Sequence, residues 1–428
     1  MIVKFIGHAT IIFYDNQNNP IFCSDPWLIG SCYWRSWWLE SPPDKNVLEQ
    51  LSTCPFIYIT HEHPDHFHFP TIKKIGKSPT YLLAKQAHKS NYNFLKAHGF
   101  QVNEIPSYKW VNIGNNLKIA TFPQWNDDSV ILIETPKYYF VNINDARLSK
   151  AGILKIKELL IESKKIILCQ SYSPASFIHN FYFNNIRIEI VDKQSYIKPI
   201  LKNCELLNAD YFIPFASQNV FLRQDSSWAN TFKIGEDDLR KSWSGITALL
   251  PNYPHINLDK EFDYTTPDRK FPPKEAYELA RLEQNKSTLL DSKDLQDLCA
   301  LLTKKFSFMS WLLVALFPMG IAFCLNKEQK ILYSPIKRKA YTLKNNEKSS
   351  IIISTDSSAL MSALKYDHFN DLSISMFTRI DVNHKYLHPR FLYLVFILLE
   401  LHDHGHFKSV KNFFKFIKIN IFRLLSSV

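Results

Sequence analysis

The segment from Thr60 to His66 has the residue types and spacing of a metal site, because three histidines and an aspartate fall within six residues. It reads Thr-His-Glu-His-Pro-Asp-His and directly follows the apolar run Phe56–Ile59. These side chains can turn toward one point only where the chain leaves a strand as a loop. Imidazole nitrogens and carboxylates are ligands of first-row divalent metals, and two neighbouring ions need about this many. The spacing therefore predicts a metal centre rather than a histidine-rich surface loop.

The elements that must position this loop are indicated by the hydrophobic pattern. Residues 1–145 contain short β runs separated by polar turns, and helical periodicity enters at 85–98 and 150–163. This order predicts sheets covered by helices. A charged, proline-rich stretch at 252–274 is typical of a linker. We therefore expect a first domain at residues 1–265.

The loop and its surroundings resemble the metallo-β-lactamase superfamily. The stretches Gly7-His8-Ala9-Thr10 and Asp25-Pro26-Trp27 are similar to the opening of one branch of that superfamily. More narrowly, residues 25–30, Trp37-Trp38 and 57–74 are similar to the catalytic part of the CMP-N-acetylneuraminate hydroxylase family. The resemblance implies an α/β fold, namely an αββα sandwich with one or two metal ions at the strand ends.

The same resemblance implies two divalent metal ions. His61, His63 and Asp145 would hold one ion, and Asp65, His66 and Asp145 the other. Asp145 lies just beyond the β run at 138–142 and would bridge the two ions. Between two cations its carboxylate should stay ionised.

Several further positions are implied to act on this centre. His8 and Asp65 are the residues expected to take part in catalysis, and Asp25 would orient a ligand histidine from behind, or would only be a turn residue before a proline. Gln124 stands where the superfamily has a third histidine. An amide is a poorer ligand than imidazole, so Asp127 or Asp128 could take its place.

Cationic and aromatic residues predict an anionic substrate. Arg35 and Trp38, together with neighbouring tryptophans, could stack on a molecule such as a nucleotide sugar and neutralise it. Arg147 and Arg223 follow expected strand ends and could bind a phosphate or carboxylate. Core packing of the tryptophans and ordinary salt bridges of the arginines are the alternatives.

Residues 266–428 are expected to form a smaller α+β domain without a catalytic cluster. A helix at 273–304 precedes strands, including one at 372–377, and the pattern is similar to sterol-carrier domains. The run 306–325 is uncharged for 20 residues. It is long enough for a membrane span, but Pro318 and Gly320 interrupt it and favour a buried helix that leads into a strand.

Two features near the end of the chain each allow two interpretations. Between two segments with helical periodicity, every second residue is a histidine, at His402, His404 and His406. These histidines belong either to an exposed turn or to a group with a metal or pH role. Residues 408–425 form a basic amphipathic pattern that suits either an anionic membrane surface or packing on the domain itself.

Composition limits the setting of this chemistry. The net charge of +11 is spread along the chain and favours anionic partners, for which we expect a small molecule and not nucleic acid. The seven cysteines include no CxxC pair, and the N-terminus has no secretory pattern. We therefore expect a cytoplasmic protein, with membrane association through its last helix as an option.

Two reactions fit the implied ligands. In the first, two irons bind dioxygen and hydroxylate a C–H bond, with electrons from a separate Rieske or ferredoxin protein, because the chain starts at the equivalent of the hydroxylase catalytic part. In the second, zinc or manganese lowers the pKa of a bound water to about 7, and the hydroxide attacks an ester, lactone or phosphodiester. The monooxygenase is preferred, the hydrolase is the alternative, and a binding module with a degenerate site is a third option.

Overall fold

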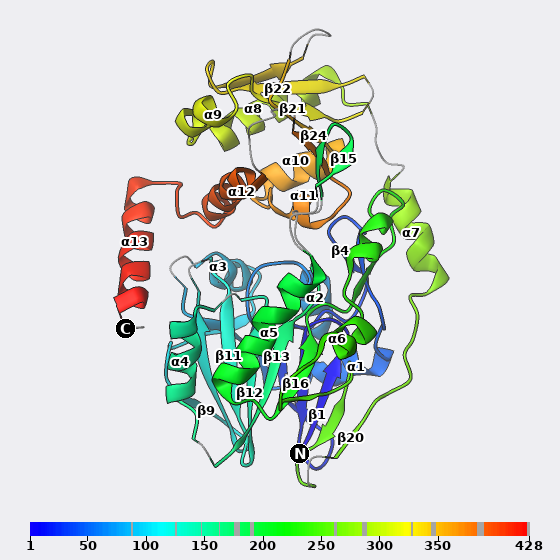
Figure 1. The fold of residues 1–428 in the computed structure, drawn as a ribbon, viewed down its shortest axis with the longest axis vertical. Coiled ribbons are helices and arrows are strands. Elements are labelled where there is room, and N and C mark those ends of the chain that lie inside the picture. The colour runs from blue at the N-terminus through cyan, green and yellow to red at the C-terminus, as the bar shows by residue number, and fades with distance from the viewer. Residues whose placement is uncertain are drawn as a thin grey trace.

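The structure is a computed structural model of the 428-residue chain. It describes residues 1–86, 89–124, 126–146, 148–161, 163–174, 180–188, 192–260, 263–284, 289–326, 328–343, 348–382 and 389–425. A larger unit with two facing sheets forms one end of the molecule, and a smaller unit with a third sheet forms the other (Figure 1).

The first sheet of the larger unit has eight strands. In spatial order they are β20 (Asp263–Thr265), β19 (His255–Asn257), β1 (Ile2–Ile6), β2 (Thr10–Tyr14), β3 (Pro20–Ser24), β6 (Phe56–Ile59), β7 (Thr80–Ala84) and β8 (Gln101–Ile105). The strands from β3 to β8 are parallel, whereas the β1 and β2 pairings are antiparallel.

The second sheet has seven strands. In spatial order they are β18 (Ala248–Leu249), β16 (Tyr211–Phe215), β13 (Lys165–Ser171), β12 (Tyr138–Asn144), β11 (Ser129–Glu134), β10 (Leu117–Pro123) and β9 (Val111–Gly114). Its central strands β12, β13 and β16 are parallel. They are apolar on both faces, as expected for strands with a layer on each side.

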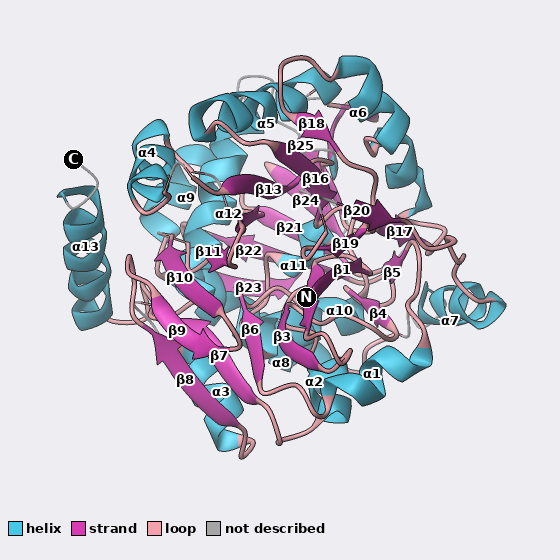
Figure 2. Cartoon of the chain, turned by 90° about the horizontal axis from the view of Figure 1, so that it is seen from below, coloured by secondary structure: helices cyan, strands magenta, loops and turns pink. Residues whose placement is uncertain are grey.

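Helices cover the outer faces of both sheets (Figure 2). They are α1 (Lys45–Leu51), α2 (Phe69–Ile75) and α3 (Ser90–Ala97) on the first sheet, and α4 (Lys150–Glu158), α5 (Lys193–Leu207) and α6 (Glu236–Ser242) on the second. Three separate apolar clusters fill the spaces between these four layers. The middle cluster packs Phe13 of the first sheet edge-on against Phe140 of the second. The layers therefore follow the expected αββα order.

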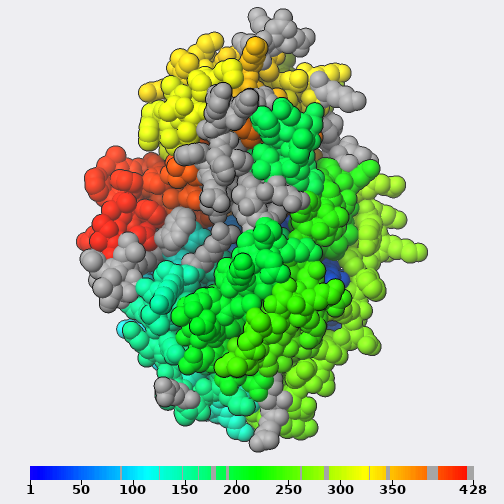
Figure 3. Space-filling model, viewed as in Figure 1, coloured from blue at the N-terminus to red at the C-terminus, as the bar shows by residue number. Residues whose placement is uncertain are grey.

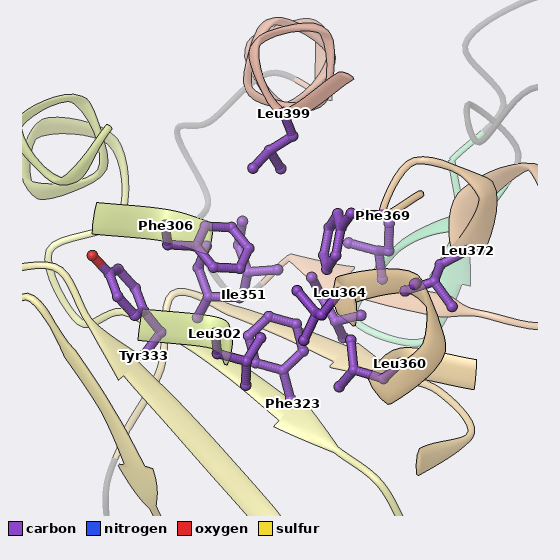
Figure 4. Packing of buried hydrophobic residues seen from close by; sticks show 14 of the residues in the cluster. Leu302, Phe306, Phe323, Tyr333, Ile351, Leu360, Leu364, Phe369, Leu372 and Leu399 are labelled. Atoms are coloured by element: carbon purple, nitrogen blue, oxygen red, sulfur yellow. The ribbon is translucent and has the colours of Figure 1, made fainter. Parts of the chain in front are cut away.

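The third sheet belongs to the smaller unit. Its strands, in spatial order, are β15 (Ile186–Arg187), β14 (Phe181–Phe183), β25 (Arg379–Val382), β24 (Ile351–Ser354), β21 (Ile321–Cys324), β22 (Lys330–Ser334) and β23 (Lys339–Thr342). The helices of this part of the chain are α7 (Lys274–Gln284), α8 (Ser292–Ser307), α9 (Ser310–Leu316), α10 (Ser357–Lys365), α11 (Asp371–Ile374), α12 (Pro389–Asp403) and α13 (Val410–Leu425). Phe306, Phe323 and Phe369 pack at its centre (Figure 4).

Strands β14 and β15 come from the first half of the chain but pair with the sheet of the second half. Residues 181–187 therefore belong to the third sheet although they precede the predicted boundary at residue 265. The division into residues 1–265 and 266–428, and the likeness to sterol-carrier domains, stay predictions.

The expectation of a strand at 372–377 is wrong, because this segment begins with the short helix α11. Its alternation of apolar residues and serines indicated a strand, but the serines serve the turns instead. The Ser373 hydroxyl donates to the Asn370 carbonyl, and the Ser375 hydroxyl donates to that of Leu372. Side-chain bonds of this type compete with a strand ladder.

The uncharged run 306–325 forms the end of α8, then α9, and then strand β21. Among the described residues, no single helix is long and apolar enough to cross a bilayer; α8 and α9 meet that test only together, across an 88° bend.

A small third element joins the two units near the metal loop. It consists of β17 (Asn219–Phe221), β5 (Trp37–Leu39) and β4 (Ser31–Cys32), followed by a 3-10 helix at Ser227–Phe232. Its residues pack with two from the smaller unit in what we call the junction cluster, formed by Trp27, Cys32, Tyr33, Trp37, Leu39, Phe221, Ala229, Ile374 and Met376.

His68 caps helix α2 immediately after the metal loop, and its protonation should weaken the fold. Its Nδ1 accepts a hydrogen bond from the Thr71 amide, and burial lowers its pKa to about 4. Because the unfolded histidine titrates near 6.5, the unfolded state binds more protons between these values, and stability falls as the pH drops from about 6.5 to 4. We expect a contribution of up to roughly 3 kcal/mol to be lost in this window.

The check is urea unfolding of metal-free protein at pH 7 and pH 4, with His68→Asn, which keeps a capping side chain, beside His98→Asn at an exposed position. The loss on acidification should be smaller in His68→Asn than in the other two proteins. An equal loss in all three would contradict the assignment.

Candidate metal centre

The loops that carry the predicted ligands meet at one edge of the sandwich. Asp25 follows β3, residues 60–66 follow β6, and Asp145 follows β12. β3 and β6 are neighbouring parallel strands, and β12 lies in the facing sheet. Ligands of open α/β sheets bind outside the carboxyl ends of strands, which is where these side chains gather.

One group of side chains at this edge contains His61, His66 and Asp145. One ligand atom from each lies within 4.8 Å of the others. Nε2 of His66 is 3.3 Å from the Asp145 carboxylate, and the His61 and His66 ring centroids are 4.2 Å apart. Nε2 of His61 also lies 2.9 Å from Nδ1 of His63. The structure thus places His61 and Asp145 in one group, with His63 beside His61, and adds His66, which was predicted for the second ion.

A second group contains His8, Asp65 and His66, again within 4.8 Å. The Asp65 carboxylate is 3.1 Å from Nε2 of His8 and 3.3 Å from Nε2 of His66. Gly7, with φ of 65°, turns the chain between β1 and β2 so that His8 reaches this point, and a Cβ there would lie 3.1 Å from the Trp27 carbonyl. His8, predicted to take part in catalysis, therefore lies where a metal ligand could lie, and its catalytic role stays a prediction.

These groups fit divalent metal ions by their own chemistry. Both ring nitrogens of His8 and Nε2 of His66 are buried without a hydrogen bond of good geometry. Buried polar atoms are normally satisfied, so nitrogens that face carboxylates in this way indicate ligand positions. Burial and the neighbouring His66 lower the pKa of His61 well below its usual value, and a neutral imidazole is the form that binds a metal.

Asp25 holds His66 from behind, as predicted. Its fully buried carboxylate accepts from the Thr60 amide (2.8 Å), the Thr60 hydroxyl (2.7 Å) and the Asn144 side-chain amide (2.7 Å). Nδ1 of His66 is 3.1 Å from the same carboxylate. A carboxylate behind a ligand histidine fixes its tautomer and orientation.

Asp65 is held by an unusual turn in residues 33–35. The Tyr33 hydroxyl donates to its carboxylate over 2.6 Å. Tyr33, Trp34 and Arg35 all have positive φ, between 50° and 60°. Each non-glycine residue in this region costs about 1–2 kcal/mol, so the surrounding structure must hold the turn.

Arg223 holds this turn and is not placed to bind substrate, which corrects the prediction. Its guanidinium is buried, donates to the Trp34 carbonyl (3.2 Å), pairs with Asp225 in bidentate fashion and stacks on Phe377. The strand-end position suggested a substrate arginine, but packing of the smaller unit covers it.

The other predicted substrate residues occupy varied places. Arg35 reaches α7, where it contacts the Leu279 carbonyl and lies 3.6 Å from the Glu283 carboxylate. Trp38 is buried and donates its indole N–H to the Arg35 carbonyl. Arg147 lies outside the described residues. The contacts of Arg35 and Trp38 join the turn to α7, so their role toward a substrate stays a prediction.

Residues 126–128 place Asp128 beside the centre. The Gln124 amide N–H donates to the Asp128 carbonyl, and the Gln124 side chain donates to the Phe122 carbonyl. The Asp128 carboxylate lies 3.4 Å from Nδ1 of His61, and burial and the neighbouring Asp145 raise its pKa well above the usual range. The structure therefore gives Asp128, one of the two alternatives to Gln124, the contact with a ligand histidine.

The smaller unit adds charged groups beside the loop of His61 and His63. Burial raises the pKa of Asp371 in α11 and of Glu400 in α12, and both interact electrostatically with His63 and Glu62. Glu62 pairs with His404; burial opposes both charges, yet the pair lowers the pKa of Glu62 and raises that of His404 to about 10. Only the alternating histidines at 402–406 signalled this contribution in the sequence.

Four layers with histidine and carboxylate loops at the strand ends define the metallo-β-lactamase fold, and the chain has this fold. The metallo-β-lactamase fold protein from Bacillus subtilis aligns with 59% of this chain and 95% of its own length, at 11% identity and a TM-score of 0.37. No protein-family model matches the chain.

More particularly, part of the chain is similar to cytidine monophosphate-N-acetylneuraminic acid hydroxylases. The inactive hydroxylase of Homo sapiens is 29% identical over 171 residues, which cover 38% of this chain and 33% of that protein. The hydroxylase of Xenopus laevis is 26% identical over 266 residues, covering 58% of this chain and 43% of that protein. The chain thus spans only about a third to two fifths of the length of these relatives.

Removal of a central ligand should release metal without unfolding the protein. We expect Asp145→Ala and His61→Ala to weaken metal binding by at least about 10-fold. Each variant deletes a direct ligand, and loss of a residue that only supports a ligand already weakens metal binding about 10-fold. The Asp145 side chain is 34% exposed, so its truncation leaves little cavity. Metal content after dialysis measures the effect.

His98→Ala, at the exposed C-terminal end of α3, is the control and should keep its metal. Circular dichroism verifies folding of all variants. Wild-type metal content in folded Asp145→Ala and His61→Ala would contradict the site.

Proposed function

We propose that the protein is a metal-dependent monooxygenase that hydroxylates a small anionic molecule, with electrons from a separate Rieske or ferredoxin protein. The observation that supports this best is the similarity to cytidine monophosphate-N-acetylneuraminic acid hydroxylases, at 26–29% identity. A ligand set of histidines and carboxylates is compatible with iron. A nucleotide sugar is the kind of substrate that the relatives' names suggest.

In this proposal His61, His63 and Asp145 would hold one ion, and His8, Asp65, His66 and Asp145 would hold the other. Bound iron would supply redox chemistry with dioxygen, whereas zinc or manganese would supply Lewis acidity toward water. Asp25 keeps His66 oriented. The Tyr33 hydroxyl binds one carboxylate oxygen of Asp65 and holds that oxygen away from His66. These residues hold the ligands in place before a substrate arrives.

Two carboxyl groups of the smaller unit would face the substrate side. The raised pKa values of Asp371 and Glu400 favour their protonated forms. Protonated carboxyls reduce the negative charge that an anionic substrate meets, and they can donate hydrogen bonds to it. The net charge of +11 favours the approach of such a substrate.

Metal identity combined with turnover separates this function from a hydrolase. Protein is purified without oxygen from cells supplied with iron and zinc, and its metal content and absorption spectrum are measured before and after reduction and exposure to oxygen. About two irons per chain, an oxygen-dependent spectral change and product carrying oxygen-18 from labelled dioxygen are the expected results. Asp145→Ala should lose all three signals.

Redox-silent zinc or manganese, together with cleavage of ester, lactone or phosphodiester substrates, would replace the proposal with the hydrolase. Protein without metal that still binds a nucleotide sugar would replace it with a binding role.

We also propose that helix α13 contacts anionic membranes. Its residues Val410, Phe414 and Ile421 are 73%, 65% and 50% exposed and recur at helical spacing. Lys411, Lys415 and Lys418 accompany them on the exposed side of the helix. The helix lies at the outer edge of the molecule (Figure 3). An exposed apolar face flanked by lysines is typical of helices that lie in a lipid interface.

Flotation with vesicles checks this proposal. Binding is expected to vesicles that contain about 30% anionic lipid, to fall several-fold at high salt, and to be lost in Phe414→Asp. Phe94→Asp, at an exposed phenylalanine of α3, is the matched control. Equal binding of both variants, or none by the wild type, would contradict the contact.

A further inference from the structure

A third group of metal-binding side chains lies where the end of the chain meets the loops of the larger unit. Asp127, His404 and His406 each offer one ligand atom, and these atoms lie within 4.8 Å of one another. We propose that Asp127, His404 and His406 form a separate structural site for one zinc ion, which fastens the segment between α12 and α13 to the loops of the metal centre.

The geometry of the group brings two imidazoles to one carboxylate. Nε2 of His406 lies 2.8 Å from the Asp127 carboxylate, and Nδ1 of His404 lies 3.7 Å from the same oxygen. The side chains of His406, Asp127 and His404 are 2%, 8% and 10% exposed. An exposed interhelical turn, the other interpretation of the histidine pattern, is therefore wrong for His404 and His406, because the turn packs onto residues 126–128.

Two atoms of this group lack a hydrogen bond despite their burial. They are Oδ1 of Asp127 and Nδ1 of His404. The 3.7 Å distance joins Nδ1 of His404 to Oδ2 of Asp127, the oxygen that Nε2 of His406 also contacts, and it is too long for a hydrogen bond. A zinc ion between the three ligand atoms would satisfy Nδ1 of His404 and bind the Asp127 carboxylate and Nε2 of His406.

The opposite nitrogen of His404 supports this assignment independently. Nε2 of His404 contacts the Glu62 carboxylate, so Nδ1 is the atom left to face Asp127. A ligand histidine usually donates its other N–H to a carboxylate, which sets the tautomer and strengthens the ligand. Here Glu62 is the carboxylate on one nitrogen of His404, and Asp127 faces the other nitrogen.

The position of the site suggests what the metal would do. Glu62 stands between His61 and His63, and Asp127 precedes Asp128, which lies 3.4 Å from His61. On the other side, His406 packs on Phe416 of α13 with ring centroids 4.5 Å apart. An ion held here would tie α13 and the end of α12 to both loops that flank His61.

Two imidazoles and one carboxylate form a ligand set that suits zinc, and a water would complete its four-coordination. His402 belongs to the same alternating run but contributes no atom to the group, since its ring stacks on Phe308 with centroids 4.3 Å apart. It is therefore a matched internal control.

The test counts zinc in full-length protein in which the main centre is already disabled by Asp145→Ala. Samples are equilibrated with buffered Zn²⁺, and the zinc content of this background is compared with the same protein carrying His404→Ala plus His406→Ala, or His402→Ala. We expect the double variant to bind about one zinc fewer per chain, and His402→Ala to bind as much as the background.

Cobalt substitution gives a second readout. Co²⁺ in a histidine and carboxylate site has visible absorption bands, which the double variant should lack and His402→Ala should keep. Limited proteolysis between α12 and α13 should slow at least several-fold with Zn²⁺ in the background protein and in His402→Ala, but not in the double variant.

Equal zinc content in the background and the double variant would overturn the proposal and leave a buried ion-pair network without metal. Equal loss in His402→Ala would overturn it as well. If the double variant does not fold by circular dichroism, Asp127→Asn, which keeps the side-chain shape, takes its place with the same expected loss. Because every comparison is made without the main centre, failure of the proposed monooxygenase function does not affect the outcome.

Discussion

The buried carboxylate of Asp25 is the interaction on which the metal centre depends. Burial of an unpaired charge costs more free energy than any single contact contributes. Both carboxylate oxygens of Asp25 must therefore have partners. Here Thr60 donates twice, Asn144 donates once and His66 lies at 3.1 Å, which ties three strand ends from both sheets to one group. The loops can converge on metal because they first converge on Asp25.

The turn at 33–35 illustrates what the fold tolerates to complete this arrangement. Three consecutive residues with positive φ would cost several kcal/mol in an isolated peptide, on the order of 1–2 kcal/mol each. Arg223 and the junction cluster hold the turn closed, and the Tyr33 hydroxyl thereby reaches Asp65. Strain of this kind at a ligand is typical of functional sites, where a fixed orientation outweighs its cost in stability.

The sequence predicted the parts of the centre that are local and left out those that need tertiary contact. The spacing of His61 to His66, the strand before it and the carboxylates Asp25 and Asp145 are local features, and the structure brings them together. The burial of Arg223 depends on Phe377, and the placement of His404 beside Glu62 joins residues more than 300 positions apart. Neither periodicity nor spacing in a single sequence indicates such pairs. The alternating serines at α11 gave the pattern of a strand, although they form turns.

The two units therefore cannot be treated as a catalytic part with an appendage. Asp371 and Glu400 come from α11 and α12, which lie on the side of the smaller unit that faces the larger one (Figure 1), and His404 directly follows α12. Each of the three acts electrostatically on the loop of His61 and His63. Ser36 and Trp37 donate to carbonyls of Ser375 and Ile374, so the same interface also fixes the strained turn. Because the charges that a substrate meets come from both units, their docking sets the electrostatics of the site as directly as the metal ligands do.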